Sequence, residues 1–289
     1  DNPQIYALST TDPYLGNVDL KSNLADETPN WAPQLTAVAG GLGTAISNSD
    51  ASTYNFDNES YHYFDYHSQN FVNLTATSAN NVAMTGANVN WGYNSIVYVS
   101  SLAKYFIIGV DISGSASNGT IGIFEILNIN TGQIAANPTL TVASYTVPVG
   151  MEIIFLQMLS IATDNNDTVF AVSQSEIFKF DLNSLQTAHV SYPLSGVADE
   201  YYGLEYNNRL NLLNAIQYVP GQTMQIVEIS PTSLQVTNQS VDIYTSISSF
   251  FQDYYSTTLS CDENSYFISC RALTGNPNTD FYKIDIGLQ

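Results

Sequence analysis

Basic residues are scarce in this sequence. Its 289 residues include 6 Lys and Arg against 26 Asp and Glu, so the formal net charge is −20. A field of that sign repels nucleic-acid phosphates and anionic lipid headgroups, which argues against both as partners. The same field attracts cations, Ca²⁺ among them, but no motif requires a cofactor and we expect none.

Long apolar runs are also missing. The most apolar stretch, at 147–162, is interrupted by Glu152 and Gln157, so we predict no transmembrane helix. The chain opens with DNPQIYAL, as a mature secreted protein would after loss of its signal peptide, and we therefore expect an extracellular localisation. With 44% hydrophobic residues the chain can bury a sizeable core, and we expect one domain over 1–289.

Cysteine is rare, with Cys261 and Cys270 as the only two, nine positions apart. In an oxidising compartment they would form a disulfide around a small hairpin loop, and two free thiols are the alternative. Five N-glycosylation acceptor motifs fit the same compartment. Their asparagines are Asn58, Asn73, Asn118, Asn166 and Asn238, of which the first, third and fourth lie in predicted turns.

Histidine is nearly as rare, with three residues, and two of the three lie in YHYFDYH at 61–67. Along a strand, successive side chains point to opposite faces, so His62 and His67 lie on opposite sides. They cannot share one metal ion from a regular strand. We therefore interpret this stretch as a β-strand of unusual composition.

Catalytic signatures are absent as well. The sequence has no GxSxG, HExxH, CxxC or phosphate-binding glycine loop. TDNND at 163–167 resembles the start of a calcium loop but lacks its glycine and distal glutamate, so we predict a hairpin turn there. Pairs such as Glu152 with Asp199 could act on a glycosidic bond, but no spacing selects them. We assign no catalytic residue and expect a non-catalytic protein.

Helical periodicity is nearly absent, and a strand repeat is present instead. The pattern is an apolar residue, then Asp, Asn or Glu, then another apolar residue, commonly followed by a turn residue. The central residues are 46, 63, 53, 47 and 57 positions apart, near a propeller blade's length. The six copies are centred on Asp19, Asp65, Asn128, Asp181, Glu228 and Asp285.

Further strands precede most copies and a weaker one follows several, which gives about four per repeat. The fold class we predict is all-β, a six-bladed β-propeller of four-stranded antiparallel blades. Five or seven blades, a β-sandwich or a β-solenoid are the alternatives. The first repeat lacks an innermost strand and the last an outer one, so ring closure, or a strand from a partner chain, stays open.

In a propeller, the loops that lead into the innermost strands surround one mouth of the central channel. Those loops are rich in aromatic residues with carboxylates between them. Flat rings suit the apolar face of a sugar or a peptide, and carboxylates accept hydroxyl hydrogen bonds. Packing between blades is the alternative role. The predicted ligand-binding residues are Trp31, Trp91, Tyr93, Asp199, Tyr201, Tyr202, Phe251, Asp253 and Tyr254.

On this repeat, the chain resembles secreted six-bladed β-propellers over nearly its whole length, although the WD, kelch and Tyr-Trp-Thr-Asp blade signatures are missing. Its composition is similar to that of extracellular proteins of social amoebae and other protists. The resemblance implies a secreted, glycosylated, non-catalytic propeller that binds an extracellular glycan or protein through the aromatic rim. One alternative is a self-assembling subunit of a filament or surface layer. Another is a hydrolase resembling the Ca²⁺-dependent lactonases.

Overall fold

The fold was analysed in a computed structural model of the chain. The structure describes residues 4–8, 14–19, 36–37, 52–65, 68–75, 79–113, 120–142, 159–173, 176–183, 190–193, 200–219, 222–243, 254–259, 263–271 and 279–286. Among the described residues, no helix has the length and apolar character needed to cross a membrane. The one helical element among them is a single 3₁₀ turn, η2 (Ser100–Leu102).

The described strands form six separate sheets, each antiparallel and each built from consecutive strands. The first three sheets are β1 (Gln4–Leu8), β2 (Tyr14–Asp19) and β3 (Thr36–Ala37); β4 (Ser52–Asn55), β5 (Ser60–Asp65), β6 (Asn70–Leu74) and β7 (Ala79–Ala83); and β8 (Trp91–Val99), β9 (Lys104–Asp111), β10 (Ile121–Asn128), β11 (Gln133–Ile134) and β12 (Leu140–Val142).

The other three sheets follow the same plan. They are β13 (Ser160–Thr163), β14 (Thr168–Ser173), β15 (Glu176–Asp181) and β16 (Val190–Pro193); β17 (Glu200–Asn207), β18 (Leu212–Val219), β19 (Thr223–Ile229) and β20 (Val236–Gln239); and β21 (Tyr254–Leu259), β22 (Ser265–Arg271) and β23 (Thr279–Asp285).

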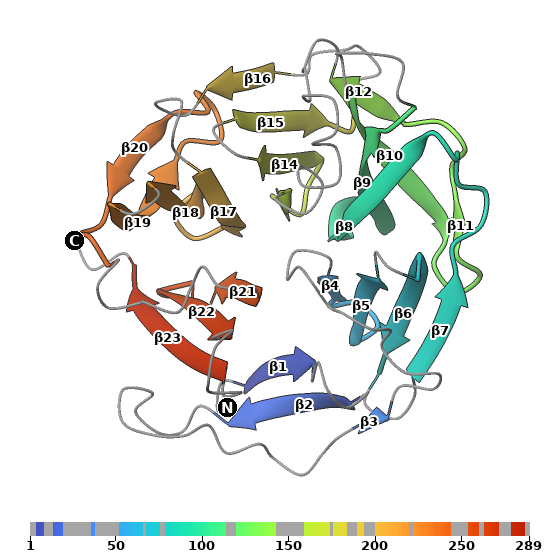
Figure 1. Ribbon diagram of the computed structural model, residues 1–289, viewed down its shortest axis with the longest axis horizontal. Helices are drawn as coiled ribbons and strands as arrows, with labels where there is room; N and C mark the ends of the chain where they lie inside the picture. The colour runs from blue at the N-terminus through green and yellow to red at the C-terminus, as the bar shows by residue number, and fades with distance from the viewer. Residues whose placement is uncertain are drawn as a thin grey trace.

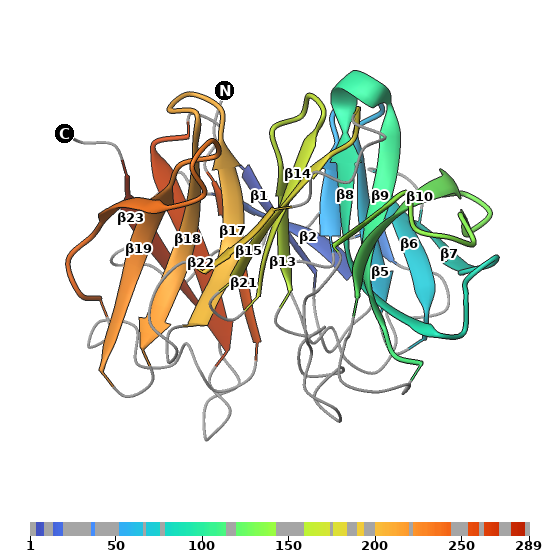
Figure 2. The same cartoon turned by 90° about the horizontal axis from the view of Figure 1, so that it is seen from above.

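The sheets are arranged in a ring around a central axis, in chain order (Figure 1). Within each sheet the first strand lies nearest the axis and later strands lie further out, as in a propeller blade. The β8–β9 and β17–β18 turns lie at one edge of the ring when it is seen from the side (Figure 2). We call this edge the hairpin face, and the edge at which β8 and β17 begin the opposite face.

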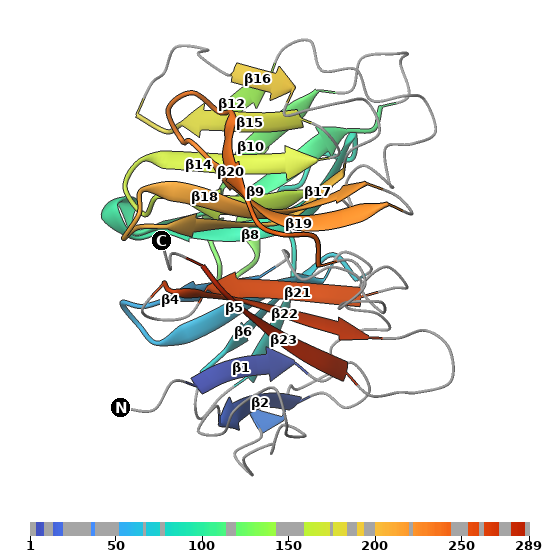
Figure 3. The same ribbon diagram turned by 90° about the vertical axis from the view of Figure 1, so that its left-hand side faces the viewer.

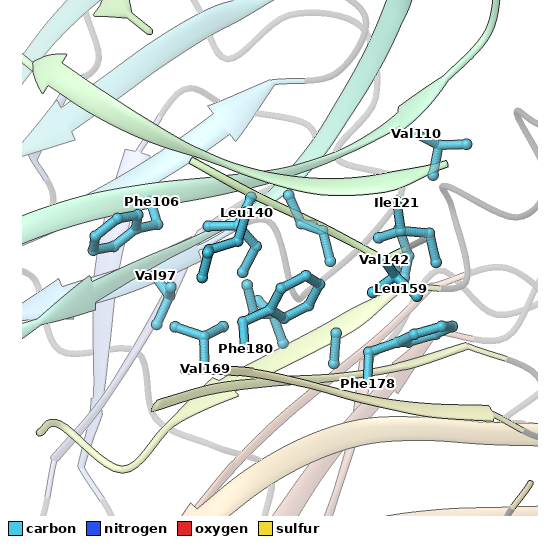
Figure 4. Packing of buried hydrophobic residues seen from close by; sticks show 14 of the residues in the cluster. Val97, Phe106, Val110, Ile121, Leu140, Val142, Leu159, Val169, Phe178 and Phe180 are labelled. Atoms are coloured by element: carbon cyan, nitrogen blue, oxygen red, sulfur yellow. The ribbon is translucent and has the colours of Figure 1, made fainter. Parts of the chain in front are cut away.

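Buried side chains pack the consecutive sheets against one another. One cluster joins the sheet β8–β12 to the sheet β13–β16, and Figure 4 shows Phe106, Leu140, Phe178 and Phe180 within it. Three further clusters fill the interfaces between β4–β7 and β8–β12, between β13–β16 and β17–β20, and between β17–β20 and β21–β23. The sheets β8–β12, β13–β16 and β17–β20 each pack against a neighbour on both faces. Their strands therefore contain continuous runs of apolar residues, as is usual for sheets buried on both sides.

The predicted β-propeller with four-stranded antiparallel blades is confirmed, and the sandwich alternative is wrong. The sheets β1–β3 and β21–β23 have three strands each in the part of the chain that the structure describes. With two strands before it and one after, each copy of the repeat was predicted to lie on the third strand of its blade. This holds for Asn128, Asp181 and Glu228. It is wrong for Asp65, which ends β5, the second strand of its sheet. At Asn128 the repeated polar residue closes the following turn, since its Oδ1 accepts hydrogen bonds from the amides of Asn130 and Thr131.

Gly203 lies where the sheet β17–β20 approaches the sheet β21–β23 so closely that a side chain would not fit. It has φ +61° in a bulge of β17, and a Cβ there would lie 2.5 Å from Thr257 Cγ2 and would overlap the hydroxyl of Tyr266. We expect Gly203→Ala to reduce the free energy of unfolding by at least about 2 kcal/mol, because it adds both backbone strain and a steric clash. Urea denaturation measures this loss. The same substitution should cost less in a Tyr266→Phe background, and an equal cost would contradict the assigned clash.

Candidate binding face

The members of the predicted aromatic rim at the starts of β8 and β17 lie on the opposite face. Four of its members, Trp31, Asp199, Phe251 and Asp253, lie outside the described residues. Tyr254, predicted in the loop that leads into an inner strand, is the first residue of β21. Side chains are described for the remaining four, Trp91, Tyr93, Tyr201 and Tyr202.

Trp91 and Tyr93 lie at the start of β8 and both contact Phe124 of β10. Their rings meet the Phe124 ring edge-on, with centroids 4.9 and 5.0 Å away. Tyr93 is fully buried, and its hydroxyl accepts a hydrogen bond from the amide of Asn88 at 3.1 Å. Trp91 is partly buried against the same cluster, so part of its indole stays accessible.

Tyr201 and Tyr202 lie at the start of β17 and are both buried. Tyr201 packs toward the sheet β13–β16, and Tyr202 packs toward the sheet β21–β23. The Tyr202 hydroxyl donates to Glu200 Oε2 at 2.5 Å. Burial raises the pKa of Tyr202, and the hydrogen bond to Glu200 and its negative charge raise that pKa further. The Glu200 carboxylate at the start of β17 therefore accepts a hydroxyl hydrogen bond from the protein itself.

The structure adds a feature that the sequence did not reveal, an exposed apolar group beside Trp91. Val89 is 91% exposed and Ile112 is 39% exposed. Val89 lies just before β8 and Ile112 just after β9. These two segments are held together because the Ile112 amide donates to the Asn90 carbonyl at 2.6 Å and Trp91 pairs with Asp111. We call Val89, Trp91 and Ile112 the Val89 patch. Sequence reasoning missed Val89 and Ile112 because single aliphatic residues in loops carry no periodic signal.

His62 lies in a different place, buried between β5 and the neighbouring sheet. It is 1% exposed, and its Nε2 lies 2.6 Å from Ser60 Oγ and 2.7 Å from the Tyr105 hydroxyl. Asn55 Nδ2 donates to the same Tyr105 hydroxyl at 2.6 Å. Burial lowers the pKa of His62 to about 4, so the ring is neutral at pH 7.

This polar cluster does not have the arrangement of a nucleophilic site. A serine nucleophile needs a base that a third group orients, but Nδ1 of His62 has no hydrogen-bond partner. Ser60 is also buried, so a substrate would not reach its hydroxyl. The two histidines of 61–67 cannot be compared in space, because His67 lies outside the described residues.

In the described residues, no group of three or more His, Cys, Asp or Glu side chains could hold a metal ion. TDNND forms the turn between β13 and β14. Asp164 Oδ1 accepts hydrogen bonds from the amides of Asn166, Asp167 and Thr168 at 2.9, 3.2 and 3.0 Å. These contacts use the oxygen that a calcium loop would offer to the ion, and the predicted hairpin turn is confirmed.

The predicted modification sites fall in varied places. Asn58 and Asn166 are exposed in the β4–β5 and β13–β14 turns on the hairpin face. Asn73 lies within β6, where its Nδ2 donates to Asn130 Oδ1, and Asn238 lies in β20. Asn118 and Cys261 lie outside the described residues, while Cys270 lies in β22 opposite Tyr255. Glycosylation and the disulfide stay predictions.

The fold is similar to that of several solved structures, although their sequences differ widely. TolB from Acinetobacter baumannii superposes with a TM-score of 0.50 at 10% identity, over 93% of this chain and 60% of the TolB chain. Kuenenia stuttgartiensis hydrazine synthase gives a TM-score of 0.49 at 8% identity, over 99% of this chain and 93% of that one. An oligogalacturonate lyase from Vibrio parahaemolyticus gives 0.47 at 10% identity, over 98% and 76%.

The TolB match, at 10% identity, shows a shared fold alone and leaves activity open. No family model matches the sequence, and no curated protein matches it significantly. The chain spans 60% of the length of the TolB chain with which it superposes. The function must therefore be argued from this chain's own residues.

Proposed function

We propose that this protein is a secreted, non-catalytic propeller in which each of the six sheets serves as a blade. Its opposite face binds an extracellular protein, with the Val89 patch at the centre of the contact. The observation that carries this proposal is the nearly complete exposure of Val89 beside Trp91 and Ile112. Neighbouring exposed apolar residues rimmed by polar ones are typical of interaction sites.

A protein partner fits the patch better than a glycan does. Sugars stack on flat aromatic faces, but the exposed atoms here belong largely to branched aliphatic side chains. The Trp91 indole uses part of its surface on Phe124 and on Gly122. The chain's net charge of −20 favours a basic partner, whose association would slow as salt screens the attraction.

The double substitution Val89→Asp and Ile112→Asp tests the patch. We expect at least a tenfold loss of partner binding, because two carboxylates would be desolvated at the centre of the contact. Stability should stay within about 0.5 kcal/mol, because both side chains are exposed. The measurement is retention of extracellular proteins by the immobilised wild type and variants, followed by titration of the retained protein.

Phe56→Asp is the matched control, since Phe56 is 72% exposed but lies in the β4–β5 turn on the hairpin face. A protein retained by the wild type and by this control, and lost by the double variant, supports the proposal. Retention that is equal in all three proteins would remove the Val89 patch as the binding site.

A self-assembling structural subunit is the second candidate. The observation in its favour is that the sheets β1–β3 and β21–β23 each have three strands in the described residues, where the other sheets have at least four. An edge strand can pair with a strand from another copy. Size-exclusion chromatography across a hundredfold range of concentration distinguishes the candidates, since a monomer throughout is incompatible with assembly.

A further inference from the structure

A row of polar side chains crosses the sheet β17–β20. Asn214 of β18 is paired with Glu205 of β17 on one side and with Glu228 of β19 on the other. Directly paired residues of antiparallel strands project from the same face, with Cβ atoms about 5 Å apart. Both carboxylates therefore flank the same asparagine.

Asn214 is unusual because it is completely buried and has no hydrogen-bond partner. It is 0% exposed, and neither its Oδ1 nor its Nδ2 makes a hydrogen bond. Burying an amide without partners costs several kilocalories per mole on most scales, so native proteins almost always satisfy such groups. An amide that is buried, unpaired and flanked by two carboxylates indicates a ligand.

The row faces the next sheet, β21–β23. Thr257 Oγ1 of β21 donates to Glu205 Oε1 at 3.2 Å, and Ile216 and Ile226, on the same face as Asn214 and Glu228, pack against that sheet. The two sheets lie side by side in Figures 1 and 3. The row therefore lies at the contact between two blades, with Asn214 buried and Glu205 and Glu228 half-buried.

We propose that Glu205, Asn214, Glu228 and Thr257 form a binding site for one Ca²⁺ ion. The carboxylates and the neutral oxygens Asn214 Oδ1 and Thr257 Oγ1 are the hard donors that Ca²⁺ prefers, and water would complete its six to eight ligands. Glu205 and Glu228 lie two strands apart, so their Cβ atoms are about 10 Å from each other, since neighbouring strands are about 4.8 Å apart. Both side chains are long enough to reach one ion above Asn214. With no imidazole or thiolate in the row, Zn²⁺ is disfavoured.

The ion would also resolve two electrostatic problems. It would give Asn214 Oδ1 a partner, while Asn214 Nδ2 would donate to a carboxylate. It would neutralise two carboxylates at a contact between blades in a chain of net charge −20. The basic residue nearest in sequence, Arg209, directs its guanidinium to the Glu263 carbonyl at 3.4 Å, so it serves another contact.

Calorimetric titration of the EDTA-treated full chain with CaCl₂ tests the site, with MgCl₂ as a parallel titration. We expect one saturable Ca²⁺ site per chain, a higher melting temperature in Ca²⁺ than in EDTA, and a weaker response to Mg²⁺. Glu228→Gln should weaken Ca²⁺ binding at least tenfold. Glu176→Gln, which removes the same charge from a strand of another sheet, should leave it unchanged.

Asn214→Leu provides a second readout that does not depend on the carboxylates. It replaces an unpaired buried amide by an apolar side chain of similar size, so in EDTA its melting temperature should equal or exceed that of the wild type. In Ca²⁺ the variant should gain no further stability. No saturable site, or equal weakening by Glu228→Gln and Glu176→Gln, would overturn the proposal.

Discussion

Phe178→Ala is expected to lower the free energy of unfolding by about 3–5 kcal/mol. Phe178 is fully buried where the sheet β13–β16 packs against the sheet β8–β12 (Figure 4). Truncation removes its buried ring and leaves a cavity that close-packed sheets cannot fill by collapse. Since domains are stable by about 5–15 kcal/mol in total, this loss should be plain in urea denaturation at 25 °C.

Phe56→Ala is the control for this prediction, because it deletes the same atoms from a side chain that is 72% exposed. Its ring contacts Tyr54 edge-on at 4.9 Å and little else is lost, so we expect a change of at most about 0.5 kcal/mol. If the two substitutions cost the same, Phe178 does not lie between packed sheets.

His62 is expected to make the protein lose stability in acid. Its pKa is about 4 in the folded chain and about 6.5 when unfolded, so folding favours the neutral ring. Above pH 6.5 the stabilisation that comes from keeping His62 neutral is fully present. Below that pH the unfolded chain binds a proton that the folded chain does not, so the stabilisation falls and is lost near pH 4. A difference of about 2.5 pH units corresponds to about 3 kcal/mol.

The measurement is urea unfolding of the wild type and of His62→Gln at pH 7.5, 5.5 and 4. Glutamine can still bond to Ser60 and Tyr105 but does not titrate, so comparing the two slopes cancels what the carboxylates contribute. The wild type should lose about 3 kcal/mol more than the variant between pH 7.5 and 4. Parallel slopes would show that His62 is not buried as a neutral ring.

Much of the fold was predictable because each blade repeats a local pattern. In five of the six sheets the predicted second and third positions match strands of the structure, such as Thr168–Ser173 and Glu176–Asp181. The prediction for the second sheet was shifted by one strand, because Phe64-Asp65-Tyr66, at the end of β5, resembles the repeat. The uneven spacings on either side of Asp65, 46 and 63 residues, could have revealed this error. Leu74, at the end of the third strand β6, is 55 residues from Asp19 and 54 from Asn128.

The sites were less predictable, because they depend on which residues meet across strands and sheets. Trp91 and Tyr202 were selected as aromatic loop residues, but the sequence could not reveal that their neighbours would be Phe124 and Glu200. The Glu205–Asn214–Glu228 row depends on a register that the bulge between Tyr202 and Glu205 sets. His62 and Tyr105 are 43 positions apart and meet only when two sheets pack.

A crystal structure of the protein grown with Ca²⁺ is the most direct test of the central claim, that consecutive antiparallel sheets pack face to face around one axis. We expect the sheet β13–β16 between β8–β12 and β17–β20, with Phe178 on the side of β8–β12 and Tyr201 contacting the other side of the sheet. Two stacked sheets with strands exchanged between layers, or Phe178 in contact with solvent, would contradict the account.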